Sequence, residues 1–268
     1  MRQFKGISIG FSSFFKAIPF IFKNKLWWTF LIPIALSLTL YIIGFSFVGN
    51  MGDWLKGIIN NCLLTENSSE FVTGVVKILG GITKLLMQFI FLIIFYYLSG
   101  YILLILLSPL FAWISERTDQ IINQTDYPFE WKQFFKDIWR GIALAFRNLF
   151  YEIAISLIVI IINFIPVINF ISAPLSVIFL FLLSSYFYGF SYMDYTSERK
   201  KLNAKESIQL IRNNKGMAIA NGALFSFSLL IPVLGGITAI IASVGATLAM
   251  NEIPEIKNRI IEPKIKKA

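Results

Sequence analysis

Two proline-centred breaks in apolar stretches are the places where this sequence could bind a ligand. Pro166 and Pro174 interrupt the charge-free stretch 153–193, and the pair Ile165-Pro166 returns as Ile231-Pro232 in a second apolar stretch. A helix that starts after such a break leaves its first backbone N–H groups without intrahelical partners, and a helix N-terminus that faces water can bind an oxyanion. The candidate anion ligands nearest the breaks are Asn169, Ser172, Gly235, Gly236 and Thr238.

The same residues have a second interpretation, as structural hairpin turns. Their polar groups can cap the turns at Pro166, Pro174 and Pro232, because free backbone groups in a membrane need partners. Other polar residues of the apolar stretches can line an anion route or form hydrogen bonds between helices. These residues are Asn163, Asn221, Ser243 and Thr247.

The sequence lacks the residue combinations that enzymes use. It contains no histidine, and its single cysteine, Cys62, falls in a predicted loop. Hydrolysis or group transfer would need a nucleophile with a base, a metal cluster or paired carboxylates, and the acidic residues do not cluster within the apolar stretches. We therefore expect no catalytic residues, no metal and no cofactor.

Composition places the chain in a membrane. Hydrophobic residues make up 56% and charged residues 15% of the sequence, whereas soluble domains carry about 25% charged residues. The net charge is +9, but the bases flank apolar segments. That distribution is typical of cytoplasmic loops and of contact with anionic lipids, so we expect membrane lipids and not nucleic acid as partners.

We expect a single all-α membrane domain over 1–268, with two long transmembrane helices, two short proline-broken helical hairpins and amphipathic interfacial helices. The first interfacial helix repeats phenylalanine at helical spacing, which suits either the membrane interface or packing on protein. The predicted segments are an interfacial helix 1–24, span 26–52, far-side loop 53–84, span 85–115 bent at Ser108-Pro109, interfacial helix 128–152, hairpin 153–193, linker helix 194–216, hairpin 217–250 and basic tail 251–268.

The hairpins have short arms. The arm 153–165 would be about 20 Å long as a helix, less than the roughly 30 Å of a bilayer core. We expect hairpins that enter the membrane and return, with short complete spans as the alternative. Either way, all but three of the 24 Lys and Arg residues fall on one side, which predicts cytoplasmic termini.

Two acidic residues end apolar stretches on the basic side. Because Glu116 and Asp194 need cationic partners there, we expect structural ion pairs that fix the hairpins to the interfacial helix 128–152, with proton coupling as the alternative. The available bases are Arg117, Arg140, Arg147 and Arg199.

The order of these features resembles the CysZ sulfate permease family, which shares a domain with the eukaryotic etoposide-induced, autophagy-associated membrane proteins. The positions that carry the resemblance are Ser108-Pro109, Glu116, Ile165-Pro166, Pro174, Asp194-Tyr195, Ile231-Pro232 and Gly245-Ala246-Thr247. The resemblance implies a homo-oligomer in the inner membrane with two long spans and two half-penetrating hairpins. It also implies sulfate uptake for cysteine biosynthesis without an ATPase subunit; a non-transporting membrane scaffold is the alternative.

The resemblance also points to a binding region. Permeases of the family carry a Gly-hydrophobic-Arg-Arg motif at the start of the first long helix, and the arginine pair falls on Trp27 and Trp28 in this chain. Lys23 and Lys25 lie beside them and can replace the arginines as point charges. Trp27 and Trp28 are also placed as interfacial anchors.

Overall fold

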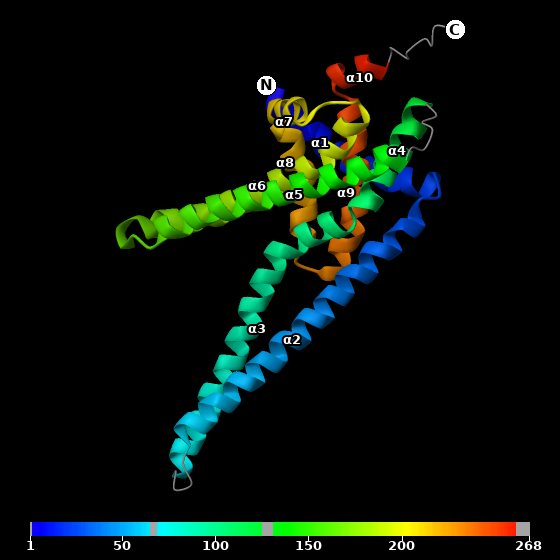
Figure 1. Ribbon diagram of the computed structural model, residues 1–268. Coiled ribbons are helices and arrows are strands. Elements are labelled where there is room, and N and C mark those ends of the chain that lie inside the picture. The colour runs from blue at the N-terminus through cyan, green and yellow to red at the C-terminus, as the bar shows by residue number, and fades with distance from the viewer. Residues whose placement is uncertain (1, 65–68, 125–130, 261–268) are drawn as a thin grey trace, which may run out of the picture.

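The computed structural model describes residues 2–64, 69–124 and 131–260, and these ranges contain helices and no strand. Two long helical hairpins, at residues 31–106 and 131–199, diverge from a common helical body (Figure 1). The body comprises residues 2–30, 108–123 and 204–260 with the adjoining ends of the hairpins. The all-helical prediction is confirmed. The helices are α1 (Arg2–Lys23), the short 3-10 helix η1 (Trp27–Phe30), α2 (Leu31–Leu63), α3 (Glu70–Leu106), α4 (Ser108–Asn123), α5 (Trp131–Asn163), α6 (Pro166–Arg199), α7 (Ala204–Asn213), α8 (Lys215–Ser228), α9 (Pro232–Asn251) and α10 (Pro254–Ile260).

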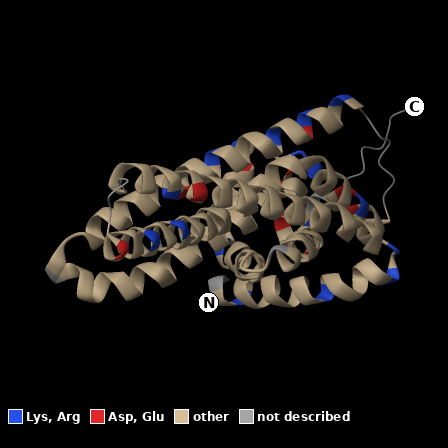
Figure 2. Ribbon diagram, turned by 90° about the horizontal axis from the view of Figure 1, so that it is seen from below, with Lys and Arg blue, Asp and Glu red and all other residues tan. Residues whose placement is uncertain are grey.

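Five helical segments are long and apolar enough to cross a membrane. Most of the helical ribbon consists of uncharged residues (Figure 2). The segments are Trp27–Leu63, Glu70–Leu106, Trp131–Asn163, Ile168–Arg199 and Val233–Asn251. The described chain is therefore that of a multi-pass membrane protein, with more candidate spans than the two long ones expected from sequence.

The α2–α3 hairpin replaces most of the predicted loop 53–84. Helix α2 continues to Leu63 and α3 begins at Glu70, while residues 65–68 lie outside the described ranges. The polar residues in this region fit between the two helices: Lys84 forms an ion pair with Asp53 at 2.8 Å, and a Cβ on Gly80 would meet the Lys56 stem. Ser69 caps α3 by accepting a hydrogen bond from the backbone N–H of Val72.

The α5–α6 hairpin is longer than the predicted hairpin 153–193. No proline interrupts 131–163, and the described part of the predicted interfacial helix 128–152 forms one helix, α5, with all but the last two residues of the predicted arm 153–165. It has 33 residues and a length of about 50 Å. Residues 128–130 lie outside the described ranges. The change from charged to uncharged residues after Glu152 suggested a helix end, but α5 continues through this position.

Only two of the three predicted turn prolines follow a turn. Pro166 and Pro232 start α6 and α9, where the missing proline N–H costs no helical hydrogen bond. Pro174 lies inside α6, so the prediction of a break there is wrong. The neighbouring hydroxyl of Ser176 donates to the backbone oxygen of Ser172 at 2.6 Å. This bond does not replace the one that Pro174 removes, whose acceptor would be the backbone oxygen of Phe170, four residues earlier.

The α8–α9 hairpin lies in the body. Helix α8 has 14 residues, about 21 Å, while α9 has 20. Gly235 and Gly236 lie in the first turns of α9 and not in the connecting turn, which corrects the predicted break at 232–236. Helix α9 packs against α1, α2, α4, α6 and α8.

The predicted bend at Ser108-Pro109 is confirmed. Helix α3 ends at Leu106 and α4 begins at Ser108, with Pro109 in its first turn. The bend turns the chain from the α2–α3 hairpin back into the body (Figure 1).

Helix α1 presents two different faces. Its small residues are buried against α8 and α9, where a Cβ on Gly10 would lie 2.7 Å from the backbone oxygen of Met217. Several of its phenylalanines point outward: Phe4, Phe15 and Phe22 are exposed, whereas Phe14 is buried. The helix thus combines protein packing on one face with an apolar outer face suited to a membrane interface.

The closest helix crossing in the body joins α6 and α8. A Cβ on Gly189 would lie 1.9 Å from the backbone oxygen of Ala218, and a Cβ on Gly222 would lie 1.8 Å from that of Ser185. Only glycine permits this approach, as in the small-residue contacts of membrane helices. Tyr188 and Phe225 pack edge-to-face around the crossing, with ring centroids 5.2 Å apart.

We predict that Gly222→Ala destabilises the protein by about 3 kcal/mol, because the added methyl group forces two backbones apart. Gly57→Ala is the matched control, since a Cβ there meets nothing within 4 Å and alanine favours helix. Unfolding by SDS in mixed micelles measures the stability of both variants. Equal stability of the two variants would contradict the crossing.

Candidate functional site

The predicted anion ligands in the α5–α6 hairpin lie at its tip, and the hydroxyl groups there are paired. Ser172 donates to the Asn163 Oδ1 at 2.5 Å, and the Asn163 Nδ2 donates to the Ser176 Oγ at 2.9 Å. Asn169 is exposed, and its backbone N–H donates to the oxygen of Ile165 at 2.9 Å. These polar groups close the turn.

The predicted ligands in α9 lie far from that tip, at the α8–α9 turn in the body (Figure 1). The Gly235 N–H donates to the oxygen of Ile231 at 3.0 Å. The Thr238 hydroxyl contacts the Ser228 hydroxyl and donates to the oxygen of Leu234 at 2.7 Å. The structure therefore does not join the two turns into one anion site.

Gly236 connects its turn to the start of α2. A Cβ on Gly236 would lie 2.8 Å from the backbone oxygen of Pro33, and α9 also packs against η1. The α8–α9 turn is thus a neighbour of the segment that joins α1 to α2.

This α1–α2 joint, residues 23–30, carries the other predicted ligands. Lys23 ends α1, and Lys25 adopts a left-handed conformation with φ 57°. The hydrogen bonds Leu26 N–H to Ile21 O at 2.9 Å and Lys25 N–H to Phe22 O at 3.2 Å form the motif that commonly ends a helix.

The side chains of the α1–α2 joint point outward. Both lysines and both tryptophans, Trp27 and Trp28, are exposed. The Trp28 ring packs 5.5 Å from the Trp113 ring. The joint therefore presents two cations and two indoles on one short segment, beside the first turns of α9.

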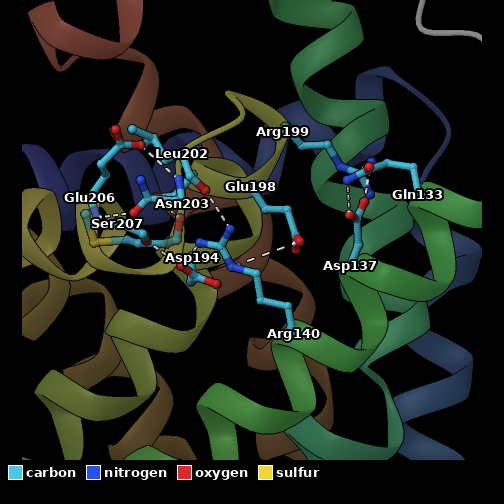
Figure 3. A network of polar contacts seen from close by, with 12 residues as sticks. Gln133, Asp137, Arg140, Asp194, Glu198, Arg199, Leu202, Asn203, Glu206 and Ser207 are labelled. Atoms are coloured by element: carbon cyan, nitrogen blue, oxygen red, sulfur yellow. Dashed lines mark hydrogen bonds and ion pairs between the residues drawn. The ribbon is translucent and has the colours of Figure 1, made fainter.

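A buried charge network occupies the other end of α6 (Figure 3). Arg140 on α5 forms an ion pair with Asp194 on α6 at 2.9 Å and donates to the oxygen of Leu202 at 2.6 Å. The Arg140 Nε lies 4.0 Å from the Glu198 Oε1, and the Ser207 hydroxyl donates to Asp194. One guanidinium thus joins α5, α6 and the segment leading to α7.

Arg199 extends this network to α4. It lies 3.0 Å from Glu116 and 2.8 Å from Asp137. The Gln133 side chain also donates to Asp137 at 2.5 Å (Figure 3).

The next residue, Lys200, pairs with a further acid of α4. Its Nζ lies 2.7 Å from Asp119, which is 0% exposed. Asn123 and Asn251 donate to the same carboxylate. Consecutive bases at the end of α6 therefore hold α4, α5 and α9 together.

The structure brings together the acidic residues Glu116 and Asp194 with Arg199 and Arg140, but not with Arg147. The Arg147 guanidinium lies over the rings of Tyr151, at 5.3 Å, and Phe190, at 5.7 Å. Its role as an ion-pair residue has no support in the described ranges.

Sequence reasoning missed several buried polar residues. Glu152 is buried, accepting hydrogen bonds from Tyr101 at 2.5 Å and from Ser184. Tyr101 and Ser184 lie 51 and 32 positions from Glu152 in the sequence, so no local pattern predicts these contacts. The i, i+4 spacing of Asp194 and Glu198 on one helix face was a signal that could have found Glu198.

Two of the polar residues suspected of lining a route, Thr247 and Asn221, instead connect helices, whereas the Ser243 hydroxyl is buried without a hydrogen-bond partner among the described residues. The Thr247 hydroxyl lies 3.1 Å from those of Ser115 and Thr196, and the Asn221 amide donates to the oxygen of Ala242 at 3.0 Å. These contacts join α4, α6, α8 and α9.

Fold and polar contacts together define a multi-pass helical membrane protein with a charged, tightly packed body. A model of the family described as sulfate transporter CysZ/Etoposide-induced protein 2.4 matches residues 13–239. The chain belongs to this family, as its resemblance predicted.

Individual relatives carry the transporter name. The sulfate transporter CysZ of Pseudomonas aeruginosa (strain LESB58) is 24% identical over 222 residues, 81% of this chain and 84% of that protein. The sulfate transporter CysZ of Pseudomonas fluorescens (strain SBW25) is 29% identical over 146 residues, 54% of this chain and 56% of that protein. The chain therefore has transporter relatives that match most of its length at low identity.

We predict strong energetic coupling between Arg140 and Asp194. Their side chains are 16% and 4% exposed, and removing one partner of a buried pair costs about 3 kcal/mol or more. Arg140→Gln and Asp194→Asn should each destabilise the protein strongly, while the double variant loses less than the sum. A double-mutant cycle under SDS unfolding measures the coupling.

The pair Lys84 and Asp53 is the matched control. Its side chains are 35% and 57% exposed, so the coupling should stay below about 1 kcal/mol. Equal coupling in the two cycles would contradict a structural role for the buried network.

Proposed function

We propose that this protein is a membrane permease or channel for a small oxyanion, with sulfate as its substrate, and that it serves sulfate uptake for cysteine biosynthesis. The observation that carries the proposal is the match to a sulfate transporter CysZ over 81% of this chain and 84% of that protein. The family match over residues 13–239 includes both long hairpins in full, not an isolated segment.

The α1–α2 joint is our proposed binding region. Lys23 and Lys25 supply exposed positive charge, and Trp27 and Trp28 lie beside them. The positive end of the helix dipole at the start of α2 adds to this attraction. The first turns of α9, which carry Gly235, Gly236 and Thr238, pack against the same helix. Asn169 and Ser172, at the opposite hairpin tip, have no part in this region.

We further propose that the body faces the cytoplasm of an inner-membrane protein. Both long hairpins leave the body and return to it, so α1, α7 and α10 lie at one end of the molecule (Figure 1). All but three of the 24 Lys and Arg residues lie outside the α2–α3 hairpin, in agreement with the excess of bases on cytoplasmic sides. Homo-oligomers would cover part of the exposed apolar surface of α5 and α6.

The decisive experiment is anion flux into proteoliposomes that contain the purified protein. We predict saturable uptake of radiolabelled sulfate that exceeds chloride uptake and is competed by sulfite, since both oxyanions offer similar acceptor oxygens. Protein-free liposomes are the control for leak.

Charge removal at the α1–α2 joint tests the binding region. We predict that the double variant Lys23→Gln, Lys25→Gln lowers sulfate uptake at low concentration about fivefold, the effect of losing roughly 1 kcal/mol of attraction. The variant Lys5→Gln, Lys16→Gln removes the same charge at exposed positions of α1 and should leave uptake unchanged. Equal uptake in both variants would remove the lysines from the site.

A membrane scaffold without transport is the second candidate function. It is favoured by the hairpin-turn hydroxyls of Ser172 and Thr238, which are engaged within the chain. Absence of flux for sulfate, sulfite and chloride, from protein that remains folded, would favour the scaffold and contradict the transport proposal.

A further inference from the structure

The structure assigns a proton-binding site to Glu152, a buried carboxyl group inside the α5–α6 hairpin. Its ligand is a single proton, which keeps the carboxyl group uncharged at neutral pH and lets it donate a hydrogen bond between helices. The inference rests on the contacts and the burial of this residue and does not depend on the transport function.

Glu152 lies within the apolar part of the chain. Its side chain is 2% exposed, and the residue belongs to the candidate span Trp131–Asn163. Its hydrogen-bond partners, Tyr101 and Ser184, belong to two further candidate spans. Ionisable residues in such segments are costly to keep charged and commonly mark ion or proton sites.

No cation compensates the Glu152 carboxyl group. Asp194 and Glu116 each lie within 3.0 Å of an arginine, but Glu152 forms no ion pair among the described residues. The nearest base along α5, Arg147, directs its guanidinium over two aromatic rings instead. Because a buried carboxylate without a cation is unstable, the group takes up a proton.

The groups that face Glu152 are uncharged hydroxyl groups. From α3, the Tyr101 hydroxyl donates to the Glu152 Oε2 at 2.5 Å, and from α6, the Ser184 hydroxyl contacts the Oε1. Tyr188 packs against the Tyr101 ring, with centroids 4.8 Å apart, and donates its own hydroxyl hydrogen to the backbone oxygen of Tyr97 at 3.1 Å. Tyrosine and serine side chains are neutral at neutral pH, so both neighbouring helices enclose the carboxyl group without charge.

These contacts define where the proton lies. A hydroxyl group can accept a hydrogen bond as well as donate one, so a protonated Oε1 donates to the Ser184 hydroxyl while Oε2 accepts from Tyr101. The neutral carboxyl group satisfies both contacts, and a site without charged partners favours this form. The proton thus joins α5 to α6, and the tyrosine joins α5 to α3.

The polar pairs on either side of Glu152 have the same neutral chemistry. Toward the body, the Asn148 amide donates to the Ser191 hydroxyl at 3.1 Å. Toward the tip, the Asn163 amide donates to the Ser176 hydroxyl at 2.9 Å. A protonated carboxyl group offers one donor and one acceptor, as these amides do, so it fits the same contact between α5 and α6.

Infrared spectroscopy of the purified full chain tests the site, because a protonated carboxyl group gives a carbonyl band that carboxylates lack. Glu152→Gln removes the carboxyl group and keeps a donor and an acceptor in its place. Glu206→Gln is the matched control. Glu206 is exposed in the capping box of α7, where glutamine is also suitable.

We expect the difference spectrum at neutral pH to show loss of this band in Glu152→Gln and no loss in Glu206→Gln. Ser184→Ala keeps the carboxyl group but removes the acceptor of its proton, so the band should move to higher frequency. A band that is unchanged in folded Glu152→Gln and Ser184→Ala overturns the proposal, because Glu152 is then ionised.

The stability of the variants is an independent readout. Glu152→Gln should unfold at the same SDS fraction as the unmodified protein. Glu152→Ala should unfold at a lower fraction, because the buried Tyr101 hydroxyl loses its acceptor. An equal loss of stability in Glu152→Gln and Glu152→Ala overturns the proposal, because the contact then requires a negative charge.

Discussion

The contact between the backbones of α6 and α8 at Gly189 and Gly222 is the constraint on which the rest of the body depends. In a membrane, helices gain little from burying apolar surface against one another, so close packing and polar contacts must hold them together. The missing side chains at these two positions let the backbones meet. Helix α9 then packs on α6 and α8, and α1 lies across α8 and α9.

The pairing of the charged residues follows from the same need for polar contacts between membrane helices. Charged groups at membrane depth are stable only when paired, and the ends of α4, α5 and α6 converge where acids and bases can meet. Arg140 pairs with Asp194, and Arg199 with Glu116 and Asp137. The network fixes the base of the α5–α6 hairpin while its tip, held by Asn163 and the nearby serines, carries no ion pair among the described residues.

The helix bend and the helix starts that proline produces were predictable from the sequence. Ser108-Pro109 marked the bend between α3 and α4, and Pro166 and Pro232 marked helix starts, because proline suits a first helical position. Pro174 looked the same in sequence, but only the structure shows that α6 continues through it. The continuity of α5 was missed because the change in charge at Glu152 resembled a helix boundary.

Long-range contacts explain most of the remaining differences. Glu152 is buried by Tyr101 and Ser184, whose positions in sequence give no indication of the contact. The packing face of α1 did have a local signal, since Gly6, Gly10, Ser13 and Ala17 recur at helical spacing and are buried. The more prominent phenylalanine repeat drew the interpretation toward the outer face.

The topology that we propose places the tip of the α2–α3 hairpin and helix α7 on opposite sides of the membrane. The single cysteine, Cys62, is exposed near the end of α2 and serves as a reporter of the α2–α3 tip. In membrane vesicles of known orientation, a membrane-impermeant maleimide should label Cys62 from one face. The variant Cys62→Ser, Lys205→Cys, exposed on α7, should be labelled only from the other. Labelling of both positions from the same face would contradict the account.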